Sequence, residues 1–67
     1  MKKFAERLKE LRIERELSQM QLAKATGLSH TAITYWETEQ RVPNANAIVI
    51  LAAFFNVTTD YLLGVEA

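Results

Sequence analysis

The chain has 67 residues with eight basic and eight acidic side chains, so its formal net charge is zero. This length accommodates one domain, 1–67, and so small a domain buries only about 60% of the surface of its unfolded chain, which argues against an internal ligand chamber. With no cysteine and a single histidine, His30, the chain lacks the residues for a disulfide scaffold, a thiol nucleophile or a histidine-rich metal cluster.

We therefore expect no metal, no cofactor and no catalytic residue. The longest apolar run, 47–55, is far shorter than the ~20 residues of a membrane span, so no membrane association is expected either. A small chain without disulfides fits the reducing cytoplasm, and we predict a cytoplasmic protein.

The first predicted helix runs from Lys3 to Arg15. Phe4, Leu8 and Leu11 recur at the i, i+4, i+7 spacing of one helix face, and lysine and glutamate fill the other face. No stretch of the chain alternates apolar and polar residues for long, so no strand is expected.

Two helices separated by a short turn follow. Ser18, with Gln21 three residues later, has the pattern of a capping box, and Gly27 supplies a left-handed residue that ends this helix. Ser29 then caps a third helix. Two capped helices with about three residues between them predict a helix-turn-helix over about 18–38.

Two further helices complete the domain. Asn44 is a plausible cap for a fourth helix over 45–55, and Asn56 tolerates the left-handed conformation at its end. Thr58 caps a short fifth helix that Gly64 stops. The sequence therefore predicts an all-α, compact five-helix domain.

The spacing within the helix-turn-helix is specific. Counted from Gln19, Ala23 lies four residues on, Gly27 eight on and Ile33 fourteen on. A small side chain at Ala23 lets the two helices cross closely, and Gly27 turns the chain with positive φ at no cost from a Cβ atom. Ile33 fills the angle between the helices, and Trp36 is interpreted as core. These residues predict a third helix that is held rigidly with one side exposed.

With these elements in place, the sequence resembles a known family, the phage-repressor/Cro (Xre-type) helix-turn-helix domains, over about Phe4 to Gly64. The resemblance implies a lambda-repressor-like fold that usually binds operator DNA as a dimer. It is carried by Ser18-Gln19-Met20-Gln21-Leu22-Ala23, Gly27-Leu28-Ser29, Ile33-Thr34-Tyr35-Trp36-Glu37, Pro43 and the tail from Leu51 to Gly64.

The resemblance also implies roles for single positions. Gln19 matches the residue that touches a phosphate and braces the recognition helix, and Arg41 keeps its place in the loop that lies against the phosphate backbone. Arg12 and Glu37 match a pair that links the first helix to the end of the recognition helix.

The remaining DNA-binding candidates lie on the third helix. The family pattern has four of its positions facing the major groove, and the residues agree, because Ala32, Ile33 and Trp36 turn inward. None of the outward residues makes the bidentate contact of arginine with guanine, so we expect modest specificity per half-site. The four major-groove candidates are His30, Thr31, Thr34 and Tyr35. Two further residues that face outward are Ser29 and Thr38.

Two positions depart from the family pattern. Glu39 stands where members usually have glycine, and Gln40 stands where they have lysine. Near a phosphate backbone, the first change adds a negative charge and the second removes a positive one. Either weaker DNA binding or a partly different use of this surface is expected.

The fourth helix is apolar on two sides, and so small a domain has too little core to bury both. One side carries Ile48, Leu51, Ala52 and Phe55. The other side carries Val49, Ile50, Ala53 and Phe54. We predict that Ile50 and Phe54, together with Thr59 and Tyr61 of the fifth helix, form part of a twofold interface. The alternative is that the last helix and the tail cover these residues.

We therefore predict a sequence-specific regulator of transcription that binds double-stranded DNA. It would be a repressor that binds a twofold-symmetric operator as a homodimer, with helix 29–38 in successive major grooves about one helical turn apart. An antitoxin-like or other protein-interaction module is the alternative, favoured by the neutral charge and by Glu39. An enzyme is not expected, because no carboxylates cluster around His30.

The distribution of charge matters more to a polyanion than its sum. Acids concentrate on and after the first helix, at Glu6, Glu10, Glu14 and Glu16, whereas 29–35 carries none. Neutrality therefore does not exclude DNA binding, but few cations facing phosphates predict a shallow dependence of affinity on salt.

Overall fold

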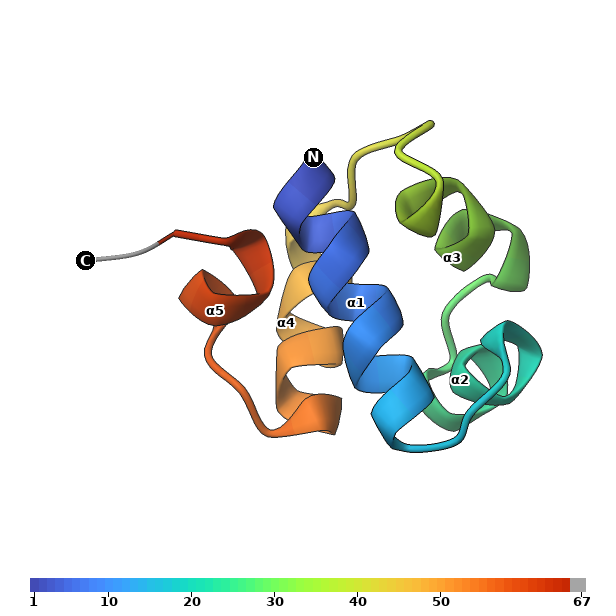
Figure 1. Ribbon diagram of the computed structural model, residues 1–67. Helices are drawn as coiled ribbons and strands as arrows, with labels where there is room; N and C mark the ends of the chain where they lie inside the picture. Colours follow the sequence, from blue (N-terminus) through green and yellow to red (C-terminus); the bar gives the residue numbers. More distant parts are fainter. Residues whose placement is uncertain (66–67) are drawn as a thin grey trace.

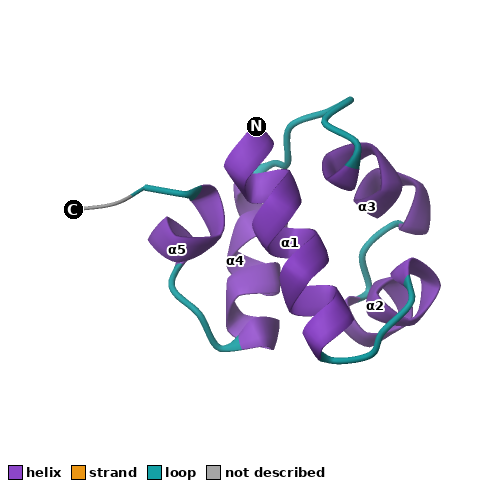
Figure 2. Cartoon of the chain, in the orientation of Figure 1, coloured by secondary structure: helices purple, strands orange, loops and turns teal. Residues whose placement is uncertain are grey.

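The computed structural model describes residues 1–65, and this part of the chain folds into helices without a strand, so the predicted all-α class is confirmed (Figure 2). The helices are α1 (Lys2–Glu14), α2 (Gln19–Thr26), α3 (His30–Glu37), α4 (Ala45–Phe55) and α5 (Thr59–Leu63). Over the described residues, no helix has the length and apolar character needed to cross a membrane.

α1 lies between two pairs of helices (Figure 1). It contacts α3 on one side and α5 on the other, while α2 packs against α3 and α4 packs against α5. α2 also contacts α4, which joins the two pairs. This arrangement holds α2 and α3 together at one end of the domain and leaves one side of α3 uncovered.

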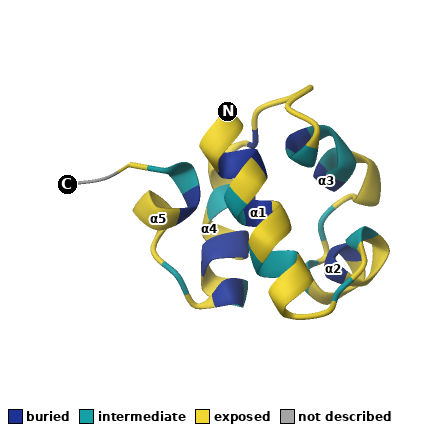
Figure 3. Cartoon of the chain, viewed as in Figure 1, coloured by how far each residue is buried: buried dark blue, intermediate teal, exposed yellow. Residues whose placement is uncertain are grey.

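The helices share one apolar core (Figure 3). At its side nearest α3, the rings of Phe4 and Trp36 meet edge to face with their centroids 6.4 Å apart. Because every helix contributes to the same core, the position of α3 depends on all the others. The fully buried aliphatic side chains, one from each helix, are Leu8, Leu22, Ile33, Leu51 and Leu62.

Four helices begin with the caps that the sequence predicts. In each, a side-chain oxygen accepts a hydrogen bond from the backbone N–H three residues later, which satisfies an amide that the first helical turn leaves without a partner. Gln21 completes the capping box, since its Oε1 accepts from the backbone N–H of Ser18 at 2.8 Å. The capping residues are Ser18, Ser29, Asn44 and Thr58.

Each helix is followed by a residue in the left-handed conformation. Gly27, Asn56 and Gly64 are predicted from the sequence and confirmed, with φ of 74°, 57° and 80°. The two others are glutamates, Glu16 with φ of 56° and Glu39 with φ of 62°. The early turn at Glu16 explains why α1, predicted as 3–15, ends one residue sooner, and the helix also begins one residue sooner, at Lys2.

The end of α3 has the hydrogen bonds of a Schellman motif. The N–H of Glu39 donates to the carbonyl of Trp36 at 3.3 Å, and the N–H of Gln40 donates to that of Tyr35 at 2.8 Å. This motif requires a left-handed residue at position 39, where any side chain other than that of glycine is strained. The structure thus gives a physical reason for the glycine that the family resemblance implies here.

Replacing Glu39 by glycine should therefore stabilise the domain. We expect Glu39→Gly to raise the free energy of unfolding by about 1 kcal/mol, because the left-handed backbone no longer carries a Cβ atom. Glu39→Ala removes the same charge but keeps the Cβ atom, and is expected to give no such gain. Urea denaturation of both variants measures the difference, and equal effects would show that charge rather than backbone strain is responsible.

Candidate nucleic-acid interface

The uncovered side of α3 begins at its capped N-terminus. Ser29 accepts the backbone N–H of Ala32 at 3.2 Å and is exposed, as are the next two residues, His30 and Thr31. One turn later Thr34 and Tyr35 are half-buried. Together with Gln19, Thr38 and Arg41, these residues are called the α3 surface below.

An ion pair beneath the α3 surface joins α3 to α1. Arg12 donates from Nε to Oε2 of Glu37 at 2.8 Å and from Nη2 to Oε1 at 2.9 Å. The two side chains expose only 12% and 3% of their surface. The hydrogen bond to Glu37 raises the pKa of Arg12, and the opposing effect of burial is smaller. The guanidinium therefore stays charged at neutral pH.

The same arginine also fixes the loop that follows α1. Its Nη1 donates to the carbonyl of Leu17 at 2.8 Å, directly before the cap of α2. One side chain thus connects the end of α1, the start of α2 and the end of α3. Within residues 1–65, every buried side-chain nitrogen and oxygen has a hydrogen-bond partner, as such a network requires.

Gln19 extends the network from Glu37 to the α3 surface. Its Nε2 donates to Oε1 of Glu37 at 3.2 Å, and its Oε1 accepts from the hydroxyl of Thr34 at 2.7 Å. Gln19 therefore braces α3 from the first residue of α2. Among the described residues, its second Nε2 hydrogen has no acceptor, so it can donate to a group outside the chain.

A second cluster forms where α3 ends. The guanidinium of Arg41 lies over the ring of Tyr35, 4.7 Å from its centroid. Thr38 donates its hydroxyl hydrogen to the carbonyl of Thr34 at 2.8 Å and accepts from Nε2 of Gln40 at 2.9 Å. The stacking on Tyr35 holds the positive charge of Arg41 beside the α3 surface.

The structure thus brings the eight predicted DNA-binding residues onto α3, its two ends and the start of α2. It links Gln19 to Thr34 and Tyr35 to Arg41, which the sequence did not predict. The sequence predicts for Gln40 only the absence of a lysine charge, whereas in the structure its backbone and side chain both hold the end of α3. In a Schellman motif, the residue after the left-handed position donates its backbone N–H to the last turn of the helix. The sequence could therefore have indicated this role for Gln40.

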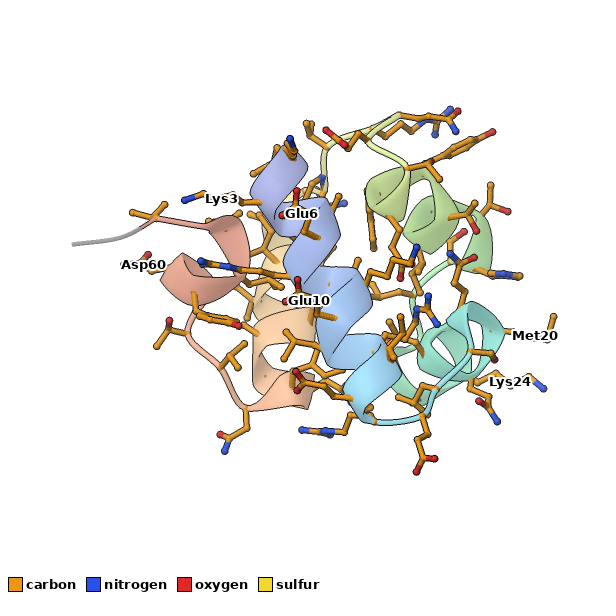
Figure 4. All side chains as sticks on the ribbon, viewed as in Figure 1. Lys3, Glu6, Glu10, Met20, Lys24 and Asp60 are labelled. Carbon is orange, nitrogen blue, oxygen red and sulfur yellow. The ribbon has the colours of Figure 1, made fainter. Side chains whose placement is uncertain are left out.

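Acidic and basic side chains occur together on one side of the domain (Figure 4). Lys3, Glu6 and Glu10 project from α1, and Asp60 lies beyond them on α5, whereas Lys24 projects from α2 at the opposite edge of the molecule. Glu37 is neutralised by Arg12, so Glu39 is the exposed acid that remains next to Arg41. The described residues contain no group of acidic and histidine side chains able to hold a metal ion.

The predicted twofold interface falls on a different side. Ile50 and Tyr61 are 38% and 42% exposed, Thr59 is exposed, and Phe54 is half-buried. Two arginines, Arg7 of α1 and Arg15 directly after it, cover part of the aromatic rings. The guanidinium of Arg15 lies 5.4 Å from the ring centroid of Phe54, and that of Arg7 lies 4.4 Å from that of Tyr61.

Arg7 also donates a hydrogen bond to the carbonyl of Tyr61, which ties α5 to α1. Gly64 completes this contact, because a Cβ atom there would lie only 2.5 Å from Cβ of Lys3. Ile50 is the one aliphatic residue among the four predicted interface residues and is exposed, and α5 is fixed in place beside α4.

Comparison with known proteins agrees with this geometry. A family model described as helix-turn-helix matches residues 8–62, which includes all of α2, α3 and α4. The chain belongs to this helix-turn-helix family, of the phage-repressor (Xre) type.

Three curated relatives illustrate its range. The chain is 41% identical over 63 residues to the HTH-type transcriptional activator BcrR of Enterococcus faecalis, covering 94% of this chain and 31% of that protein. It is 32% identical over 61 residues to the HTH-type transcriptional regulator ImmR of Bacillus subtilis, covering 91% of this chain and 48% of that protein. It is 33% identical over 60 residues to Repressor protein C2 of Salmonella phage P22, covering 90% of this chain and 28% of that protein. The chain thus spans half or less of the length of these relatives.

Removing the carboxylate of the buried pair should be costly. We expect Glu37→Ala to lower the free energy of unfolding by about 3 kcal/mol, because Arg12 is left charged and without its partner. Urea denaturation followed by circular dichroism measures the loss.

The double variant Arg12→Met, Glu37→Leu separates a stranded charge from lost packing. It removes both charges and keeps comparable volume, so it should be more stable than Glu37→Ala, although Leu17 loses its donor. A double variant no more stable than the single one would contradict this explanation.

Proposed function

We propose that this domain regulates transcription by binding double-stranded DNA in a sequence-specific manner, with α3 in the major groove. The observation that carries the proposal is the α3 surface itself. It is a polar helix face, and among the described residues the exposed acid beside it, Glu39, lies outside the helix. The Arg12–Glu37–Gln19 network holds this helix against the rest of the domain. A rigid helix of this kind fits the dimensions of the major groove.

The two ends of the α3 surface supply groups suited to phosphates. The second Nε2 hydrogen of Gln19 lies at the start of α2, and the Arg41 guanidinium lies on Tyr35 at the end of α3. Phosphate contacts of this kind position a helix, while the groups between them read the bases. With so few cations, affinity should fall only shallowly with salt.

We propose further that the domain acts as a repressor and as a homodimer in the cytoplasm. Occupation of promoter DNA is sufficient for repression, and it needs no surface besides the one that binds DNA. Among the relatives that match the chain, one is named a transcriptional activator and one a repressor protein, and we favour the repressor role. In the proposed homodimer, the same surface around Ile50 of each copy would meet across a twofold axis.

Selection of bound duplexes from a random DNA library tests the DNA-binding proposal. We expect a twofold-symmetric motif with half-site centres about one helical turn apart, and an affinity that falls only slightly between low and moderate salt. Failure to enrich any sequence at low salt would contradict the proposal. Co-purification with a second polypeptide in that case would favour the protein-interaction module.

The dimer proposal predicts a specific effect at Ile50. Because Ile50 is exposed and makes no polar contact, Ile50→Glu should leave the fold intact but place like charges across the interface. Sedimentation at micromolar concentration is expected to give a dimer for the original chain and a monomer for the variant. Ile13→Glu, the same change at a residue 55% exposed on α1, is the matched control and should stay dimeric. A monomeric original chain would rule the interface out.

A further inference from the structure

Thr34 uses the single hydrogen of its hydroxyl inside the protein, as Thr38 does at the end of α3. Its Oγ1 lies 2.7 Å from Oε1 of Gln19 and 3.2 Å from the backbone carbonyl of His30, and both of these oxygens are acceptors. A hydroxyl has one hydrogen and two lone pairs. Whichever of the two oxygens it bonds, the hydrogen of Thr34 is used inside the protein.

The orientation of the Gln19 side-chain amide determines that Thr34 donates its hydroxyl hydrogen and does not accept one from Gln19. An amide side chain can present either its oxygen or its nitrogen to a neighbour. Here Nε2 donates to Glu37, whose carboxylate can only accept and is itself held by two hydrogen bonds from Arg12. The Gln19 oxygen must then face Thr34, so the polarity of the contact is set by a charged pair on the far side of the network.

We propose that Thr34 reads its base as a hydrogen-bond acceptor only, and therefore selects a base that offers an amino group in the major groove, adenine N6 or cytosine N4. Thr34 is half-buried, so part of its side chain remains open to a partner. The hydrogen-bonding groups that guanine and thymine present in the major groove are all acceptors. Their oxygen or nitrogen atoms would face the lone pairs of Oγ1 without a hydrogen between them. This specificity rests on the proposed function, since it needs α3 in the major groove.

Thr31 provides the contrast within the same helix. It is exposed, and among the described residues its hydroxyl has no hydrogen-bond partner. Its hydrogen can turn toward a base acceptor or away from it, so Thr31 is not restricted to one class of base. The two threonines thus have identical side chains and different predicted readouts, because Gln19 and the carbonyl of His30 take up the hydrogen of Thr34.

The test begins with the motif selected from random DNA by the original chain, and repeats the selection with Thr34→Val. Valine keeps the shape of threonine and removes the hydroxyl. The position read by Thr34 is the one whose base preference changes, and we expect the original chain to select adenine or cytosine there. Selection of guanine or thymine at that position, or no change at any position, would overturn the assignment.

The decisive measurement removes the amino group from the DNA. The selected adenine is replaced by purine, or the selected cytosine by 2-pyrimidinone, and affinities are measured for both duplexes. The original chain should lose about three- to tenfold in affinity, as expected for one hydrogen bond, and Thr34→Val should lose none. An equal loss in both proteins would overturn the proposal.

Two control variants complete the design. Thr34→Ser keeps the hydroxyl and should keep the loss caused by removing the amino group. Thr31→Val is the same chemical change one turn away, and that loss should persist in it whatever happens to its overall affinity. If no sequence is enriched by the original chain, the DNA-binding proposal itself fails. A clear motif that is insensitive to Thr34→Val refutes only the role of Thr34.

Discussion

The bidentate contact between Arg12 and Glu37 is the interaction on which the arrangement of the α3 surface depends. It joins residues 25 apart in the chain and is nearly excluded from water at the Glu37 end. A buried pair of this kind gains little stability compared with apolar residues, but it is directional. Because Arg12 also bonds Leu17 and Glu37 also bonds Gln19, the pair sets the relative position of three helices and the orientation of one amide.

A directional buried pair makes the domain sensitive to mutation, because the free energy of unfolding of so small a chain is low. A chain of this size has a free energy of unfolding on the order of 3–10 kcal/mol, so a single stranded charge can remove a large part of it. Two helices are also followed by glutamates in the left-handed conformation, Glu16 and Glu39, and glycine would relieve the backbone strain at either position. Glu39 belongs to the loop beside Arg41, so a strained backbone and a repulsive charge occur together next to the proposed DNA-binding surface.

Much of the fold was predictable because local rules and tertiary packing agree. The caps at Ser18, Ser29 and Asn44 and the left-handed turns at Gly27 and Asn56 depend on few neighbouring residues, and the structure confirms them. The left-handed glutamates were not predicted, because propensity disfavours them and only the packing of the following segment imposes them.

The candidate site was predictable in outline only. Spacing on a helix places His30, Thr31 and Thr34 on one side, but it does not state which hydroxyl hydrogen is already used. The bond from Thr34 to Gln19 crosses between two helices and depends on an amide orientation that Glu37 determines. Likewise, the stacking of Arg41 on Tyr35 follows from the path of the loop after α3, which no periodicity encodes.

The measurement that tests this account most directly is nuclear magnetic resonance of the arginine side chains in solution at neutral pH. Arg12, bonded through Nε to a buried carboxylate, should show an Nε–H signal that exchanges slowly with water and correlates with the side chain of Glu37. Arg41 and Arg15, which are exposed and stacked on aromatic rings, serve as internal references and should exchange rapidly. An Arg12 signal that exchanges as fast as theirs would contradict the claim that this pair holds α3 in place.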